Sequence, residues 1–191
     1  MPWSCCSAST CNVVTRTDKH SAVGDWLLVR QVRRTGDPAA FGRLVERYQS
    51  PLRRYLTHLT GGDRFRADDL AQESFLKAFH SIRQYSGLGS FRAWLFRIAY
   101  RTFLDSRRSQ HPTVEIEKTE IGSENPAEIA ILQSALACLD ETERNLILLS
   151  AVEQLSHSQI AQATGLPLGT VKSVVARAKA KLREHLKNEE L

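Results

Sequence analysis

The chain has 191 residues, of which 42% are hydrophobic and 25% are charged, and its formal net charge is +5. This length and composition suit one ordinary domain or two small ones, and they exclude a fibrous or wholly disordered protein. No apolar stretch approaches the roughly 18 residues that cross a bilayer, and the N-terminus lacks the layout of a signal peptide, so we expect a cytoplasmic protein without membrane insertion.

Charge is distributed unevenly along the chain. Residues 21–110 carry sixteen Arg or Lys and eight Asp or Glu, residues 111–167 carry two and nine, and residues 168–187 carry six and one. Two basic blocks therefore flank an acidic middle, which suggests two places where basic side chains could neutralise the phosphates of a nucleic acid. Ordinary solvated helix faces would give the same pattern.

The four cysteines indicate neither a disulfide framework nor a common metal site. Cys5, Cys6 and Cys11 crowd the N-terminus, Cys138 stands alone, and there is no C-x-x-C pair. We predict that residues 1–20 form a disordered tail, although its three thiols leave a soft-metal site open. No metal or other cofactor is expected.

Two helices are predicted at the start of the first domain. The first covers about residues 23–34 and places Trp26 and Leu27 inward. The second begins at Asp37, a helix cap that is followed by a proline at the first helical position. Apolar residues at spacings of three and four give this second helix one buried face. It ends at the glycine pair 61–62.

The third helix is predicted over about residues 67–84, and the acids in its first turns suit the helix dipole. Leu76 is among the apolar residues expected on its inner face. The loop "YSGLGS" (85–90) follows, and Ser90 can cap a fourth helix, "FRAWLFRIAYRTFLDSRR". This fourth helix is aromatic nearly all round, and we place Trp94 in the core.

Periodicity disappears after this helix. The sequence predicts a first domain over 21–108, an acidic linker over 109–125 and a second domain over 126–187. Two capping-box patterns mark helix starts in the second domain: Asp140 with Glu143, and Ser156 with Gln159. Because no strand-like alternation persists, the fold class is all-α, with two small helical domains joined by a flexible linker.

The end of the second domain has the layout of a helix-turn-helix. This motif needs a small residue where its helices cross, a left-handed turn residue and an inward apolar residue, and Ala161, Gly165 and Val171 fit these roles. The last helix would then offer a set of side chains to a DNA major groove: Thr170, Lys172, Ser173, Ala176, Arg177 and Lys179. A purely structural helical hairpin is the alternative.

Two stretches carry a resemblance to a known family. The segments "DLAQESFLKAF" (69–79) and "SFRAWLFRIAYRTFLDSRR" (90–108) resemble region two of the sigma-70 family. The segment "LDETERNLILLSAVEQLSHSQIAQATGLPLGTVKSVVARAKAKL" resembles region four. Their order, with one short linker and without regions one and three, is similar to the extracytoplasmic-function group of sigma factors. The resemblance covers residues 21–187.

The resemblance implies roles for particular residues. Five residues would grip the clamp helices of the largest catalytic subunit of RNA polymerase: Asp68, Asp69, Gln72, Glu73 and Phe75. A second set would capture the melted promoter strand: Ser86, Gly87, Ser90, Phe91, Arg92, Arg97, Tyr100, Arg101, Arg107 and Arg108. The helix-turn-helix residues given above would read the promoter as a duplex.

The resemblance also implies partners. We expect core RNA polymerase, promoter DNA and an inhibitory anti-sigma factor anchored in the membrane, with no catalysis by the chain itself. A role in cobalt and nickel resistance, as in one type of this group, is a further expectation. The residues alone leave three alternatives: a stand-alone helix-turn-helix regulator, an enzyme whose fourth helix lines a cleft, and an adaptor that binds only protein.

Overall fold

A computed structural model describes residues 21–87, 89–109 and 134–189. Every secondary-structure element within these ranges is helical, which confirms the all-α prediction. The predicted N-terminal tail with its three cysteines, and the predicted linker from residue 110 onward, lie outside the described residues.

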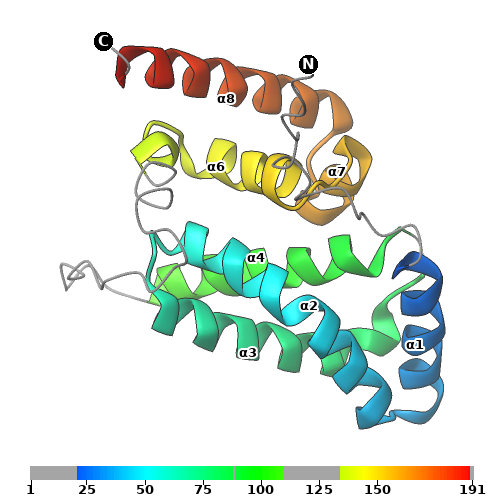
Figure 1. The fold of residues 1–191 in the computed structure, drawn as a ribbon. Coiled ribbons are helices and arrows are strands. Elements are labelled where there is room, and N and C mark those ends of the chain that lie inside the picture. The colour runs from blue at the N-terminus through cyan, green and yellow to red at the C-terminus, as the bar shows by residue number, and fades with distance from the viewer. Residues whose placement is uncertain (1–20, 88, 110–133, 190–191) are drawn as a thin grey trace, which may run out of the picture.

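The first domain is a bundle of four long helices and one short turn. These are α1 (Ser21–Thr35), α2 (Pro38–Leu59), α3 (Arg64–Ser81), the 3-10 turn η1 (Ile82–Gln84) and α4 (Phe91–Ser109). Figure 1 shows α2, α3 and α4 packed lengthwise, with α1 at one end of the bundle.

Local side-chain caps set where these helices begin. Asp37 accepts a hydrogen bond from the Ala39 amide at 2.9 Å, and Ser90 accepts one from the Ala93 amide at 3.0 Å, so both predicted caps are confirmed. Asp63 caps α3 in the same way. This third cap explains why α3 begins at Arg64, about three residues before its predicted start.

The second domain contains α6 (Glu141–Ile147), the π-helical turn η2 (Leu148–Val152), α7 (His157–Thr164) and α8 (Leu168–Glu189). Both predicted capping boxes form, at the starts of α6 and α7. Gly165 ends α7 at φ 78°, a left-handed conformation that strains residues with a Cβ, and its amide donates to the Ala161 carbonyl at 2.8 Å. The helix-turn-helix is therefore confirmed as α7 and α8.

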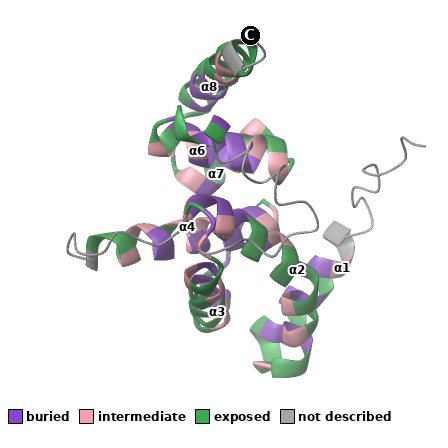
Figure 2. Cartoon of the chain, turned by 60° about the vertical axis from the view of Figure 1, so that its left-hand side comes forward, coloured by how far each residue is buried: buried purple, intermediate pink, exposed green. Residues whose placement is uncertain are grey.

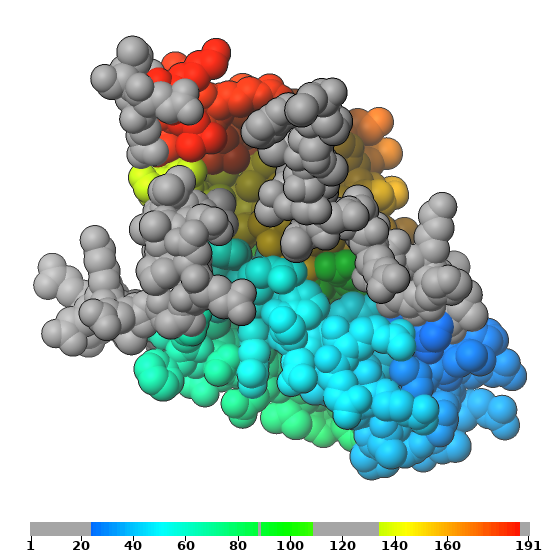
Figure 3. Space-filling model, in the orientation of Figure 1, coloured from blue at the N-terminus to red at the C-terminus, as the bar shows by residue number. Residues whose placement is uncertain are grey.

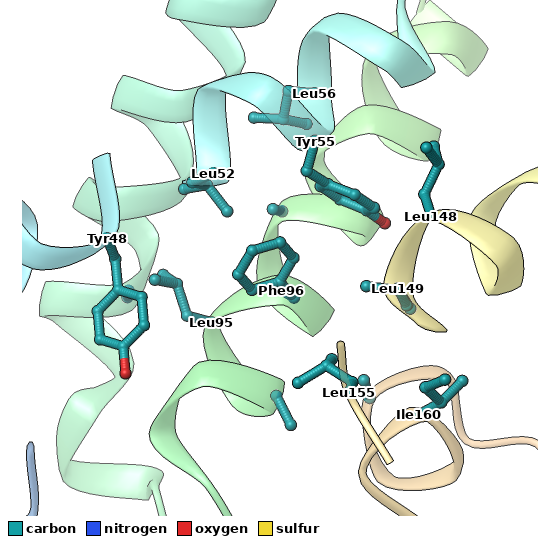
Figure 4. Close-up of a cluster of buried hydrophobic side chains, with 14 of the residues drawn as sticks. Tyr48, Leu52, Tyr55, Leu56, Leu95, Phe96, Leu148, Leu149, Leu155 and Ile160 are labelled. Carbon is teal, nitrogen blue, oxygen red and sulfur yellow. The ribbon is translucent and has the colours of Figure 1, made fainter. Parts of the chain in front are cut away.

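The two domains share one hydrophobic core. Tyr55 of α2 and Phe96 of α4 pack edge to face, with ring centroids 5.0 Å apart. Leu148 and Leu149 of η2 and Ile160 of α7 come from the other domain, and Figure 4 shows all five around the same centre. Buried residues accordingly line the facing sides of α4, α6 and α7 in Figure 2. In Figure 3 the second domain, yellow to red, sits directly on the first.

Three inward placements predicted from the sequence are wrong. Trp26 and Leu27 of α1 are 54% and 55% exposed. The side of α1 that faces the core carries Leu28, Val29 and Val32 instead. Leu76 of α3 is 61% exposed. Trp94, which was predicted in the core, is half-buried and packs against it.

Candidate protein- and nucleic-acid-binding surfaces

One exposed face of α3 carries acidic, polar and apolar side chains together. Asp69, Gln72 and Glu73 are exposed, and Leu76 follows at the spacing that keeps a residue on the same face. Phe65, one turn before Asp69, is 77% exposed. We call these five residues the α3 face. Exposed large apolar residues beside acids are a composition typical of a protein-docking surface.

The other two residues predicted for this face are placed differently. Asp68 is half-buried and pairs with Arg53 of α2 at 3.1 Å. Phe75 packs partly against the core, so it is a weaker candidate for the apolar anchor than its neighbour Leu76. The sequence prediction left Phe65 out of this surface and placed Leu76 on the inner face, although their positions at i−4 and i+7 from Asp69 indicate the same helix face.

Helix α8 divides cleanly into a buried and an exposed side. Val171, Val174, Val175 and Ala178 are buried against the rest of the domain. All six predicted duplex-contacting residues are exposed. A helix of this kind, projecting basic and small side chains behind a tight turn, has the form of a recognition helix.

Arg177 is nevertheless committed to a contact inside the domain. Its Nε donates to Glu143 Oε1 at 2.7 Å, and Lys181 Nζ donates to Glu143 Oε2 at 2.7 Å. Glu143 is fully buried and also closes the α6 capping box. Hydrogen bonds from Lys181 and then Arg177 lower the pKa of Glu143 to about 2 despite its desolvation, and Glu143 raises the pKa of Arg177. Arg177 thus fixes α8 against α6 rather than extending freely toward DNA.

The loop before α4 depends on two glycines. Gly87 and Gly89 have φ values of 79° and 86°, which strain other residues. The Tyr85 hydroxyl donates to the Gly89 carbonyl at 2.8 Å and so ties the loop back on itself. Ser86 and Gly87 are exposed, whereas the Ser90 hydroxyl is used as the α4 cap.

The predicted stacking rings on α4 are less available than the sequence suggested. Phe91 is only 4% exposed and packs among the rings of Tyr48, Tyr85 and Trp94, so the prediction that it offers a face to DNA does not fit this structure. Tyr100 is half-buried, and burial raises the pKa of its hydroxyl.

The predicted arginines of this helix fall into two groups. Arg101 and Arg108 are exposed and Arg97 is half-buried. Arg107 pairs with Glu141 of the second domain at 2.6 Å, and Arg92 pairs with Glu153 of the second domain. In this conformation, two of the predicted DNA-binding charges are therefore used between the domains.

Glu153 is the centre of an interdomain ion cluster. Its side chain is fully buried, and it accepts from Arg92 of α4 and, at 3.2 Å, from Arg54 of α2. Nearby, the Tyr55 hydroxyl donates to the Asn145 side chain across the same interface. Burial, with smaller contributions from Tyr100 and Glu153, raises the pKa of Tyr55 well above its ordinary value and keeps this donor protonated.

The loop before α4 also meets the second domain. A Cβ added at Gly89 would collide with the side-chain amide of Gln162 on α7. The loop and Arg92, both predicted to hold the melted strand, are thus in contact with the domain predicted to bind duplex DNA. We call this arrangement the closed state.

Two further findings concern the described part of the chain. Its helices include no candidate for a membrane-spanning segment. Within the same residues, no group of three or more His, Cys, Asp or Glu side chains is arranged to hold a metal ion.

Comparisons with known proteins agree with this geometry. Residues 44–113 match the family model of Sigma-70 region 2, and residues 129–182 match that of Sigma-70, region 4. The ECF RNA polymerase sigma-E factor of Haemophilus influenzae is 33% identical, over 81% of this chain and 91% of that protein.

Two solved structures are similar over most of the chain. CnrH in complex with the cytosolic domain of CnrY has a TM-score of 0.71 and 30% identity, covering 86% of this chain and 98% of that one. The sigma factor RpoE in complex with the anti-sigma factor NepR from Bartonella quintana has a TM-score of 0.63 and 26% identity, covering 77% and 96%. The chain belongs to the extracytoplasmic-function sigma factors of the sigma-70 family.

Proposed function

We propose that the protein is a non-catalytic specificity subunit of bacterial RNA polymerase, which directs the core enzyme to particular promoters and stabilises their melted form. The observation that supports this function is that both sigma regions follow each other in order along the chain. The second region also contains an exposed helix-turn-helix. Nothing in the described residues favours the alternatives of a stand-alone regulator, an enzyme or an adaptor.

The α3 face is the surface proposed to dock on the polymerase. Asp69 and Glu73 supply negative charge for a basic partner, and Leu76 supplies an apolar anchor that is already exposed. Charge steers the encounter, and burial of the exposed leucine adds apolar contact area. The clamp helices of the largest catalytic subunit are the partner that the family implies.

Duplex DNA is assigned to α8. Thr170, Lys172, Ser173, Ala176 and Lys179 remain exposed and available to a major groove. Arg177 contributes by holding α8 in place through Glu143, as a positioning residue. Free duplex binding should be weak, because few cations contact phosphates, and it should fall as the salt concentration rises, because those contacts are electrostatic.

The melted strand is assigned to the loop before α4 and to α4 itself. Arg92 is paired with Glu153, and the loop touches α7, so the domains must separate before this surface can bind a strand. We propose that docking on the polymerase drives this separation, since the enzyme holds the two domains at two distant promoter elements.

An anti-sigma factor is the proposed inhibitor. The similar RpoE was solved in complex with the anti-sigma factor NepR, and CnrH with the cytosolic domain of CnrY, which supports an inhibitor of the same class here. Membrane anchoring of that inhibitor, a cytoplasmic location, and a role in cobalt and nickel resistance stay predictions.

Size-exclusion chromatography of the purified chain with bacterial core RNA polymerase tests the proposal. We expect a stable complex that is lost in the Asp69→Lys/Glu73→Lys variant, because reversal of both charges repels a basic partner. The matched control, Glu46→Lys/Glu184→Lys, changes the same charge at exposed positions outside the α3 face and should still bind.

Two outcomes would contradict this function. Failure of the wild type to bind core polymerase, together with tight binding to duplex DNA alone, would favour a stand-alone regulator. Equal loss in both double variants would mean that net charge, rather than the α3 face, governs binding.

A further inference from the structure

A basic pocket lies on α1, beside the loop that precedes α4. It has a volume of about 480 Å³ and is formed by α1, η1 and the start of the loop. This volume falls within the range of roughly 300–1,000 Å³ that is usual for ligand sites. We call it the α1 pocket. No sequence motif pointed to it.

Four guanidinium groups line the α1 pocket: those of Arg30, Arg33, Arg34 and Arg83. No acidic side chain lines it, and within the described residues none of the four forms an ion pair. Asp25, the buried acid of α1, is engaged by Arg47 and Tyr48. Arg33 and Arg34 suit the C-terminal end of the α1 dipole, but Arg83 belongs to η1, so the dipole does not account for the whole cluster. The pocket therefore fits an anion.

An exposed indole ring completes the α1 pocket. Trp26 lines it with 54% of its surface exposed, and the Arg30 guanidinium lies over the ring at 5.2 Å from the centroid. An accessible aromatic face among arginines that form no ion pair with any other described residue is the composition with which proteins hold single-stranded nucleic acid, by stacking bases and neutralising phosphates.

The position of the pocket selects one source for such a ligand. Tyr85 and Gly87 line it and also belong to the loop proposed to capture a melted base. A strand held by that loop would continue directly into the α1 pocket. A free nucleotide is too short to contact both the loop and the pocket, so their adjacency would not increase its affinity.

We propose that the α1 pocket binds the melted promoter strand next to the captured base, with Trp26 stacking on one base and the four arginines holding the adjoining phosphates. This inference rests on the proposed function and extends it to α1, to which neither the helix-turn-helix nor the α4 surface assigns a role.

The experiment uses the full chain assembled with core polymerase. Run-off transcription of fragmented genomic DNA first supplies a promoter for the holoenzyme. Single abasic sites are then introduced one at a time along the melted non-template strand, and the affinity of the premelted promoter is measured for wild type and Trp26→Ala. Leu27→Ala is the matched control, because Leu27 is equally exposed on α1 but does not line the pocket.

We expect one abasic position to weaken wild-type and Leu27→Ala binding by about five- to 160-fold, the range measured for base stacking on an aromatic ring. The same position should have no effect in Trp26→Ala, because the stacking partner is already missing. Arg30→Ala/Arg83→Ala should weaken binding at every abasic position and lower its salt dependence.

Two results would overturn the proposal. The first is equal sensitivity of Trp26→Ala and wild type at every abasic position. The second is tight binding of AMP or GMP by the free chain that is lost in Trp26→Ala, which would make the pocket a site for a free nucleotide. Failure of the proposed function is distinguishable, because the wild-type holoenzyme would then make no run-off RNA.

Discussion

Glu143 and Glu153 present the same chemistry in two regions of the molecule. Each carboxylate is fully buried and each accepts ion pairs from two cations. The partners of Glu143, Arg177 and Lys181, belong to its own domain, whereas those of Glu153 belong to the other. The first cluster therefore stabilises the fold of the second domain, and the second stabilises the closed state. Four predictions test this division.

The largest effect is expected from Glu143→Ala. This change removes both ion pairs and half of the α6 capping box, so the free energy of unfolding should fall by about 2–3 kcal/mol. Urea denaturation followed by circular dichroism measures it. Glu184→Ala, an exposed acid of α8, should stay within about 0.5 kcal/mol of wild type. If the two variants were equally stable, the buried cluster would have no structural role.

Glu153→Gln should open the molecule while each domain stays folded. The neutral amide accepts weaker hydrogen bonds from Arg54 and Arg92, so the closed state should lose roughly 1–2 kcal/mol, which shifts the opening equilibrium about five- to thirtyfold. Small-angle X-ray scattering should show a larger radius of gyration with unchanged helix content. An unchanged radius would assign the closed state to the shared apolar core alone.

Loss of an arginine that pairs with each carboxylate should show the same division between the two clusters. Arg92→Ala leaves Glu153 with only Arg54 and should open the molecule much as Glu153→Gln does. Arg177→Ala leaves Lys181 on Glu143, and because Arg177 is exposed, we expect a smaller loss of thermal stability and no opening. Scattering and thermal melts of the two variants in parallel check this. Opening by Arg177→Ala would contradict the division between the clusters.

The last prediction concerns the pH dependence that Glu143 contributes to stability. Its pKa is lowered from 4.5 to about 2 in the folded state. Because folding depresses this pKa, the contribution is fully present above about pH 4.5 and is lost as pH falls through about 2. Urea midpoints of wild type should therefore fall with acid more steeply than those of Glu143→Gln across this window. Parallel curves would mean that the carboxylate is not specifically stabilised.

Local features of the fold were predictable because their causes lie within a few residues. The Asp37 and Ser90 caps, both capping boxes and the left-handed Gly165 each depend on neighbours at most four positions away. Which face of a helix is buried was harder, because α1 is apolar on more than one side. Trp26 was therefore placed inward, although Val29 and Val32 occupy the core.

The candidate sites were predictable as segments and less so as individual side chains. The acids of the α3 face and the exposed residues of α8 follow from helical spacing. Glu153 with Arg92, and Glu143 with Arg177, join residues 61 and 34 positions apart, and no local pattern reveals such pairs. The burial of Phe91 was also hard to foresee, because only the fold brings Tyr48 of α2 against its ring.

In the proposed function Arg92 binds the melted strand, and its pairing with Glu153 then makes the chain a competitor of its own ligand. A carboxylate, like a DNA phosphate, presents anionic oxygens to a guanidinium. Because Glu153 is tethered in the same chain, its effective concentration is on the order of millimolar or higher, and a strand that binds Arg92 must first displace it. The apparent affinity for single-stranded DNA is then lowered in proportion to the open fraction. Copies of the protein that are not bound to polymerase would therefore bind only weakly to the single strands that are transiently exposed elsewhere in the genome.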